Sequence, residues 1–332
     1  MNQITFPRIS YDGSVIKQSD LESWYCLKVE GKIRFKLNKI VTTNLTFCEK
    51  RTLTWIIKCL HSILLSSPQW QKRVVGLVDK YGVGLFWHKS NNNHFEKTDF
   101  GKKIYNAFNY DGYRSNELVL LAEKLNIKSC PYCNMHYTLF AEEGKYLKDK
   151  ITKFQFDHFY DKAEYPFLSM SLYNLIPSCG ICNQGKSTDK LALHFHPYAS
   201  SINRQFHFEV PDPLELYSGA KKDKIEVELL PDASTAADLK KYNETFHIQM
   251  LYRRHGDIAQ EVFDKAYEEA YYMDANSFKY ISQEASDYLM RLTYGTYIDE
   301  KDIEKRPMSK FIQDMRKQAI SCKTVGNVLR KN

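Results

Sequence analysis

The sequence predicts an α+β protein in which a central cysteine-rich module separates a mixed α/β N-terminal region from a mostly helical C-terminal region. Three observations support this prediction. Two Cys-x-x-Cys pairs enclose the middle of the chain, short runs of residues alternate between apolar and polar, and apolar residues recur with helical spacing towards both ends. With 332 residues and 43% hydrophobic side chains, the chain is long enough for about two domains with buried cores.

The N-terminal region, residues 1–127, is predicted to combine a strand with several helices. Residues 32–37 (KIRFKL) alternate between charged and apolar side chains, which predicts a half-buried strand. Residues 48–66 carry Leu and Ile at helical spacing, and a second helix is expected through residues 74–78. Pro68 separates these two predicted helices.

Two segments show no sustained hydrophobic period. Residues 87–112 are rich in Asn, Lys and aromatic side chains and are expected to form a long loop, followed by a helix over residues 116–125. Residues 209–238 mix Pro and Gly with acidic residues, which predicts an irregular crossing with a short strand over residues 224–229.

The C-terminal region, residues 201–332, is expected to be mostly helical after the crossing. Its apolar side chains recur at helical spacing at Ile258, Val262, Phe263, Ala266, Ala270, Phe278, Ile281, Ala285, Leu289, Phe311, Ile312, Met315 and Ile320. Residues 301–332 hold nine Lys or Arg against three Asp or Glu. This basic end could bind the phosphates of a nucleic acid or form a solvated helical face.

The sequence favours the cytoplasm as the compartment. The longest apolar stretch, residues 53–65, is interrupted by Lys58 and His61 and is shorter than the roughly 20 residues of a membrane span. The first ten residues lack the basic flank and apolar run of a secretory signal. Four of the eight cysteines form two pairs and four stand alone, which is unlike a disulfide framework.

The two Cys-x-x-Cys pairs predict one structural zinc site. Cys130 and Cys133 form the first pair, and Cys179 and Cys182 the second. Four thiolates about 2.3 Å from one ion make a closed tetrahedral site. The 45 residues between the pairs exceed the usual zinc-ribbon spacing of about 15–20, so the site should clasp an inserted element. A redox-active pair is the alternative.

The inserted element begins with residues 154–159 (FQFDHF), a short aromatic strand that carries adjacent Asp157 and His158. A return strand containing Asn174 should lead to the second cysteine pair, followed by Asn183. A helix is expected to open near residues 187–189 and to run through Leu191 and Leu193. The predicted order is strand, return strand, helix.

This pattern resembles the HNH nucleases, whose ββα-metal module spans about residues 128–200 here. The resemblance implies that Asp157 is a metal ligand, His158 the general base, Asn174 the residue that orients the base, and Asn183 the metal ligand on the helix. The paired cysteines that brace the module in many HNH proteins are also present.

The chemistry of these residue types agrees with the resemblance. A neutral imidazole such as that of His158 can deprotonate water near neutral pH once a neighbour fixes its tautomer. A carboxylate and an amide oxygen, from Asp157 and Asn183, suit Mg²⁺ or Mn²⁺. Lys186 could contact the phosphate or be a plain solvated lysine. We therefore expect a metal-dependent endonuclease that cleaves DNA.

Within the HNH group the chain most resembles prokaryotic anti-phage effectors of retron and Septu-type systems, which implies an ATPase partner. The similarity is in the residues 130–133 (CPYC), the spacing of the core, and the helical C-terminal part with residues 306–310 (RPMSK). Two alternatives are open: an RNA-cleaving enzyme of the same fold, and a non-catalytic zinc-stapled module that binds nucleic acid or protein.

Overall fold

The computed structural model describes residues 3–82, 84–89, 95–144, 146–213, 225–274 and 282–330. They form two compact units. The N-terminal unit comprises residues 3–127 and 138–200, and the C-terminal unit comprises residues 128–137 and 201–332. The sequence predicted three successive regions, but residues 138–200 pack with the N-terminal region and not as a separate body.

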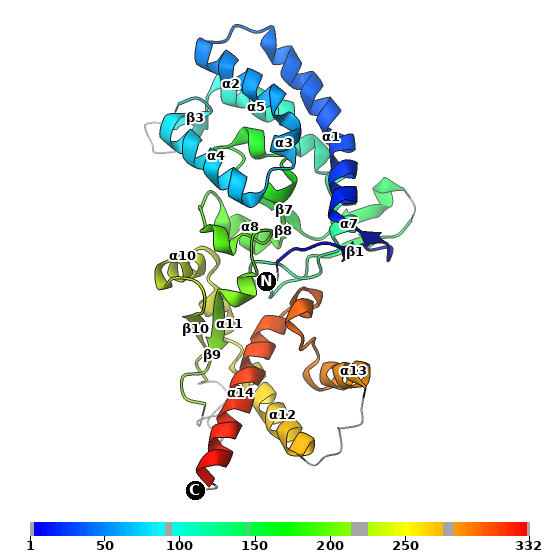
Figure 1. Ribbon diagram of the computed structural model, residues 1–332, viewed down its shortest axis with the longest axis vertical. Helices are drawn as coiled ribbons and strands as arrows, with labels where there is room; N and C mark the ends of the chain where they lie inside the picture. Colours follow the sequence, from blue (N-terminus) through cyan, green and yellow to red (C-terminus); the bar gives the residue numbers. More distant parts are fainter. Residues whose placement is uncertain are drawn as a thin grey trace. The chain divides into compact units, whose positions relative to one another are not determined.

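Helices dominate the N-terminal unit (Figure 1). They are α1 (Gln18–Val41), α2 (Phe47–Lys58), α3 (Leu60–Leu64), α4 (Pro68–Tyr81), α5 (Asp99–Phe108), α6 (Tyr110–Tyr113) and α7 (Glu117–Leu125). Helices α2 and α3 confirm the helical prediction for residues 48–66, with a break at Cys59. Helices α4 and α7 confirm the next two predicted helices.

The predicted strand over residues 32–37 is wrong, because this segment lies inside α1. Val29, Ile33 and Leu37 are four residues apart and all fully buried, whereas Phe35 is 62% exposed. The short alternation is compatible with both structures, but the four-residue spacing continues along the whole helix. The longer pattern therefore decides the structure.

The segment 87–112 is also more regular than predicted. Strands β3 (Trp87–Lys89) and β4 (Phe95–Lys97) form an antiparallel hairpin, and residues 90–94 lie outside the described residues. Thr98 then caps α5, its side chain accepting a hydrogen bond from the Gly101 N–H. Phe100, Ile104 and Phe108 are buried along one face of α5.

A β7–β8–α8 unit contains the predicted site residues. Strand β7 (Gln155–His158) pairs antiparallel with β8 (Leu175–Ser178), with Asp157 opposite Ile176, and α8 (Gly180–Lys186) packs on β7. A helix does follow the two strands, but the helix predicted to open near residues 187–189 and run through Leu191 and Leu193 is wrong. Helix α8 lies before that segment and ends at Ser187, whose φ of 45° and ψ of −118° break the helical backbone.

The remaining strands of the N-terminal unit form two small antiparallel hairpins. These pair β1 (Arg8–Ile9) with β2 (Val15–Ile16), and β5 (Phe140–Glu142) with β6 (Lys150–Thr152). Each is only two or three residues long, so the unit has no large sheet among its described residues. The core of the unit is therefore built mainly by helices.

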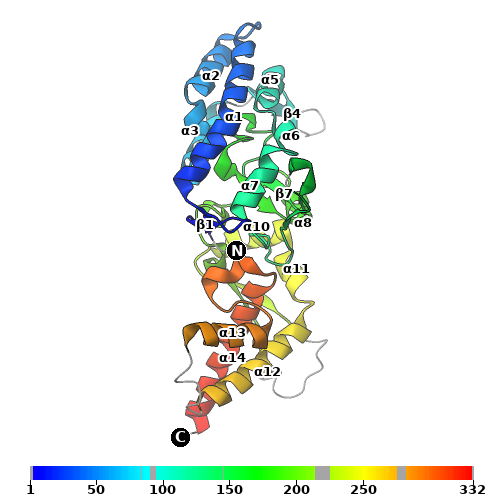
Figure 2. The same ribbon diagram turned by 90° about the vertical axis from the view of Figure 1, so that its right-hand side faces the viewer.

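The C-terminal unit pairs strands β9 (Phe206–Glu209) and β10 (Glu228–Pro231) and is otherwise mostly helical, as predicted. Its helices are α10 (Ala236–Phe246), α11 (Ile248–Tyr252), α12 (Gly256–Asp274), α13 (Gln283–Tyr294) and α14 (Ser309–Arg330). Helices α12 and α14 lie side by side (Figures 1 and 2). Parts of the predicted crossing and of the stripe, including Lys224, Phe278 and Ile281, lie outside the described residues.

The longest helix, α1, has 24 residues and carries charged side chains along its exposed face. Helix α14 has 22 residues and is similarly interrupted by charge. Among the described helices, none combines the length and the apolar character that crossing a bilayer requires.

Candidate functional site

A cavity of about 240 Å³ opens beside β7 and α8 in the N-terminal unit. Its lining residues are Tyr110, Arg114, Gln155, Phe156, Asp157, His158, Asp161, Lys162, Asn183 and Ser187. The structure thus brings together three of the five residues predicted for catalysis and catalytic metal binding: Asp157, His158 and Asn183. The other two, Asn174 and Lys186, are fully buried and do not line this cavity.

The tautomer of His158 is fixed by the backbone. Its Nε2 lies 2.9 Å from the carbonyl oxygen of Ser169, and a carbonyl can only accept a hydrogen bond. Nε2 therefore carries the proton and Nδ1 is the basic nitrogen. The Tyr110 ring packs edge-on against the imidazole, with centroids 4.4 Å apart, so the ring plane is held as well.

The electrostatic environment keeps His158 neutral. Burial, which is the largest cause, and the nearby cations Lys162 and Lys186 together lower the pKa of the imidazole to about 3. The hydrogen bond to Ser169 acts in the opposite sense. At pH 7 the imidazole is therefore neutral, and the lowered pKa also makes it a weaker base than a free histidine.

Lys186 has a different environment from either one that the sequence suggested. Its side chain is fully buried. It is therefore neither exposed to a substrate phosphate nor part of a solvated surface. Its Nζ donates to the His158 carbonyl oxygen at 2.7 Å and lies 3.5 Å from Oδ2 of Asp157, which is 3% exposed. The cation compensates a buried carboxylate and fixes the end of β7 from within the core.

The resemblance to HNH nucleases implied that Asn174 orients the imidazole, but Asn174 bonds to the backbone and not to His158. Its Oδ1 accepts a hydrogen bond from the Tyr160 N–H at 2.8 Å, and its Nδ2 donates to the carbonyl oxygens of Tyr160 and Leu168. These bonds brace the two ends of the connection between β7 and β8. Asn174 therefore affects His158 through the backbone, because Leu168 directly precedes Ser169.

Asp157 and Asn183 supply two oxygen donors to the cavity. The Nδ2 of Asn183 donates to Oε1 of Gln155, which turns the amide so that Oδ1 remains as an acceptor. One carboxylate and one amide oxygen fit a hard cation such as Mg²⁺ or Mn²⁺, which usually keeps several waters. The donor set is therefore compatible with the predicted ion.

The cavity is also lined by two cationic side chains, Lys162 and Arg114, that the sequence did not indicate as site residues. Lys162 lies 3.6 Å from Asp111 and over the Tyr110 ring, and burial lowers the pKa of its ammonium group. Arg114 comes from just before α7, far from β7 in the sequence. Because Lys162 is only four residues after His158 in the sequence, its place near the site could have been predicted. No local sequence pattern connects Arg114 to the site.

The predicted four-cysteine cluster is confirmed. Cys130, Cys133, Cys179 and Cys182 are all buried, and their sulfur atoms lie within 4.8 Å of one another, so the group could hold a structural zinc ion. The N–H of Cys182 donates to the Cys179 sulfur at 3.5 Å, and the N–H of Met135 donates to the Cys133 sulfur at 3.4 Å. Such donors stabilise thiolates.

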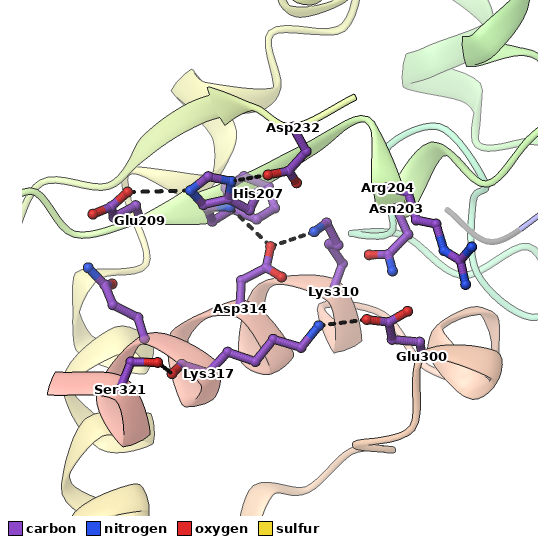
Figure 3. A pocket seen from close by; sticks show the side chains of 12 residues that line it. Asn203, Arg204, His207, Glu209, Asp232, Glu300, Lys310, Asp314, Lys317 and Ser321 are labelled. Carbon is purple, nitrogen blue, oxygen red and sulfur yellow. Dashed lines mark hydrogen bonds and ion pairs between the residues drawn. The ribbon is translucent and has the colours of Figure 1, made fainter. Parts of the chain in front are cut away.

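A larger cavity of about 560 Å³ lies within the C-terminal unit (Figure 3). Its acidic side chains are engaged: Asp232 and Glu209 with His207, Asp314 with Lys310, and Glu300 with Lys317. His207 is thus bonded on both ring nitrogens and presents no free base. We therefore place the candidate chemistry in the smaller cavity beside β7.

Comparison with known proteins gives no relative: no family model matches the chain, and no curated protein or solved structure matches it.

Proposed function

We propose that this protein is a metal-dependent HNH endonuclease that hydrolyses phosphodiester bonds in DNA. The observation that supports this most directly is that Asp157, His158 and Asn183 line one cavity beside a β7–β8–α8 unit, with the imidazole held so that Nδ1 is basic. A general base and two oxygen donors in one polar cavity are what metal-assisted hydrolysis requires.

In this proposal, His158 takes a proton from the attacking water through Nδ1 and keeps Nε2–H on the Ser169 carbonyl throughout. Arg114 and Lys162 bind the scissile phosphate and its neighbour by charge. A divalent cation held by Asp157 and Asn183 would supply Lewis-acid stabilisation of the leaving oxygen. Lys186 holds Asp157 in place from the buried side.

The substrate is tested by incubating the purified full-length protein with supercoiled plasmid, single-stranded DNA and RNA, each with Mg²⁺ or with EDTA. We expect cleavage of DNA in Mg²⁺ and none in EDTA. Cleavage of RNA alone would replace the proposed substrate with the alternative one. No cleavage of any substrate in Mg²⁺ or Mn²⁺ would favour a zinc-stapled binding module.

We further propose that the nuclease acts in the cytoplasm of a prokaryote as the effector of an anti-phage system with an ATPase partner. This proposal rests on the resemblance of residues 130–133 and 306–310 to segments of the anti-phage HNH effectors. Asn134, directly after the first segment, contacts the second. The Nδ2 of Asn134, next to the CPYC turn, donates to the carbonyl oxygens of Ile303 and Arg306, and its Oδ1 accepts from the Lys310 N–H. Phage plating on cells that express both proteins should show protection that His158→Ala removes.

A further inference from the structure

A second group of metal-ligating side chains lies away from the nuclease cavity, between α1 and α3 of the N-terminal unit. Cys26 and Glu30 come from α1, and His61 comes from α3. Their ligand atoms all lie within 4.8 Å of one another. The proposed nuclease uses none of these residues.

The helices present these side chains to one point. Cys26 and Glu30 are four residues apart, so they lie one above the other on the same face of α1. His61 reaches them from α3, which packs against α1, and its Nδ1 lies 2.8 Å from Oε2 of Glu30. Cys26 is buried, Glu30 half-buried and His61 exposed, so the group lies at the surface with its sulfur inside.

Glu30 is oriented by a neighbour. Arg34 donates from Nη2 to Oε1 of Glu30 at 2.7 Å and from Nη1 to the Ile57 carbonyl oxygen at 2.9 Å. This clamp occupies one carboxylate oxygen and directs the other, Oε2, towards His61. Residues that fix a ligating carboxylate in this way are a regular feature of protein metal sites.

We propose that Cys26, Glu30 and His61 bind a zinc ion in an open, three-ligand site. A thiolate, a carboxylate and a neutral imidazole are all zinc ligands, and their two negative charges balance the dication. Three protein ligands leave the fourth tetrahedral position to water or to another donor, unlike the closed four-cysteine cluster.

The geometry needs only a small adjustment. Ligands of a tetrahedral zinc ion are roughly 3.5 Å apart, given bonds of about 2.0–2.3 Å. The hydrogen bond between His61 and Glu30, 2.8 Å long, must open slightly to admit the ion, while the other ligand-atom separations are at most 4.8 Å. The exposed His61 ring can move to do this. Bound zinc would then link α1 to α3.

The first experiment counts zinc on the full-length protein. Protein purified with its four-cysteine cluster loaded is dialysed against micromolar free zinc and measured by elemental analysis. We expect two zinc ions per chain for wild type and for the Cys48→Ser control, a cysteine outside the group. We expect one for His61→Ala and for Cys26→Ser. A single ion in wild type, or two in His61→Ala, would overturn the proposal.

The second experiment measures stability and is independent of nuclease activity. Added zinc should raise the melting temperature of the already zinc-loaded wild type by roughly 5–10 °C when it reaches about 100 times its Kd. It should leave His61→Ala unchanged. His61 is exposed, so this variant is expected to fold. An equal rise in both proteins would place the second ion elsewhere and contradict the assignment.

Discussion

The properties of His158 depend on atoms that its own sequence neighbourhood does not reveal. The sequence predicts the residue type and its adjacency to Asp157, but the partner that sets the tautomer is the carbonyl oxygen of Ser169. Every residue has a carbonyl, so no side-chain pattern could identify this one. The same limit explains why Asn174 was assigned to the imidazole and not to the backbone of Tyr160 and Leu168.

Removing the imidazole should abolish the proposed catalysis. His158→Ala is expected to lower the rate of plasmid cleavage by about 10²- to 10⁴-fold, because a positioned general base contributes that much. The exposed His88 provides the matched control, and His88→Ala should cleave normally. A plasmid-nicking time course compares the two, and equal rates would refute the assignment of the base.

Lys186 should matter for stability. Lys186→Met removes the ammonium group that lies 3.5 Å from the buried Asp157 carboxylate, which is expected to cost about 3–5 kcal/mol of unfolding free energy. The control is Lys32→Met, which breaks a surface pair with Glu117 in which the lysine is 65% exposed and should cost at most about 1 kcal/mol. Urea denaturation measures both variants. Similar losses would contradict the buried role of Lys186.

At the scale of elements, sequence periodicity predicted helices where the apolar spacing was long, and failed where two patterns overlapped. The alternation over residues 32–37 fits a strand, yet Ile33 and Leu37 also continue the buried stripe of α1. Likewise, Asn109 ends α5 with a φ of 53°, and α6 begins directly after it, so neither helix is long enough to show a sustained period.

The helical assignment of residues 32–37 gives a test within α1. Gly31 is in the helix interior, and a Cβ built there meets nothing within 4 Å, so Gly31→Ala should raise the unfolding free energy by about 0.5–1 kcal/mol. Gly101 in α5 is the contrasting position, since its Cβ would lie 2.0 Å from the Phe86 carbonyl oxygen. Gly101→Ala should cost about 1–3 kcal/mol.

Thermal or urea unfolding of Gly31→Ala and Gly101→Ala measures both changes in unfolding free energy. Stabilisation by both, or by neither, would show that the packing around α1 and α5 is not as described.

The connection between β7 and β8 depends on Asn174. Asn174→Ala removes the partners of the Tyr160 N–H and of two carbonyl oxygens in a fully buried position, so it should cost at least about 2 kcal/mol. Cleavage should fall as well, because the Ser169 carbonyl would lose its support. Amide exchange of Tyr160 reports the local effect, and unchanged protection there would argue against the bracing role.

At the scale of the whole molecule, the cysteine spacing was the most informative part of the sequence. It predicted the four-cysteine cluster, whose sulfur atoms the structure brings together. Sequence reasoning treated residues 128–200 as a self-contained module, whereas the structure packs residues 138–200 against the N-terminal helices. Tyr25 donates to the Met170 carbonyl oxygen, and Ser171 donates to the Ile63 carbonyl oxygen. Such pairings between distant segments leave no local signal.

The central claim is that Asp157 and His158 perform metal-dependent hydrolysis in a fold braced by a separate zinc ion. Brief EDTA treatment of the full-length protein, followed by plasmid cleavage with and without added Mg²⁺, tests it most directly. Cleavage should stop in EDTA, return with Mg²⁺ or Mn²⁺, and fail to return in Asp157→Ala, while zinc stays on the four cysteines because that site is coordinatively closed. Cleavage that survives EDTA, or that Mg²⁺ restores in Asp157→Ala, would contradict the account.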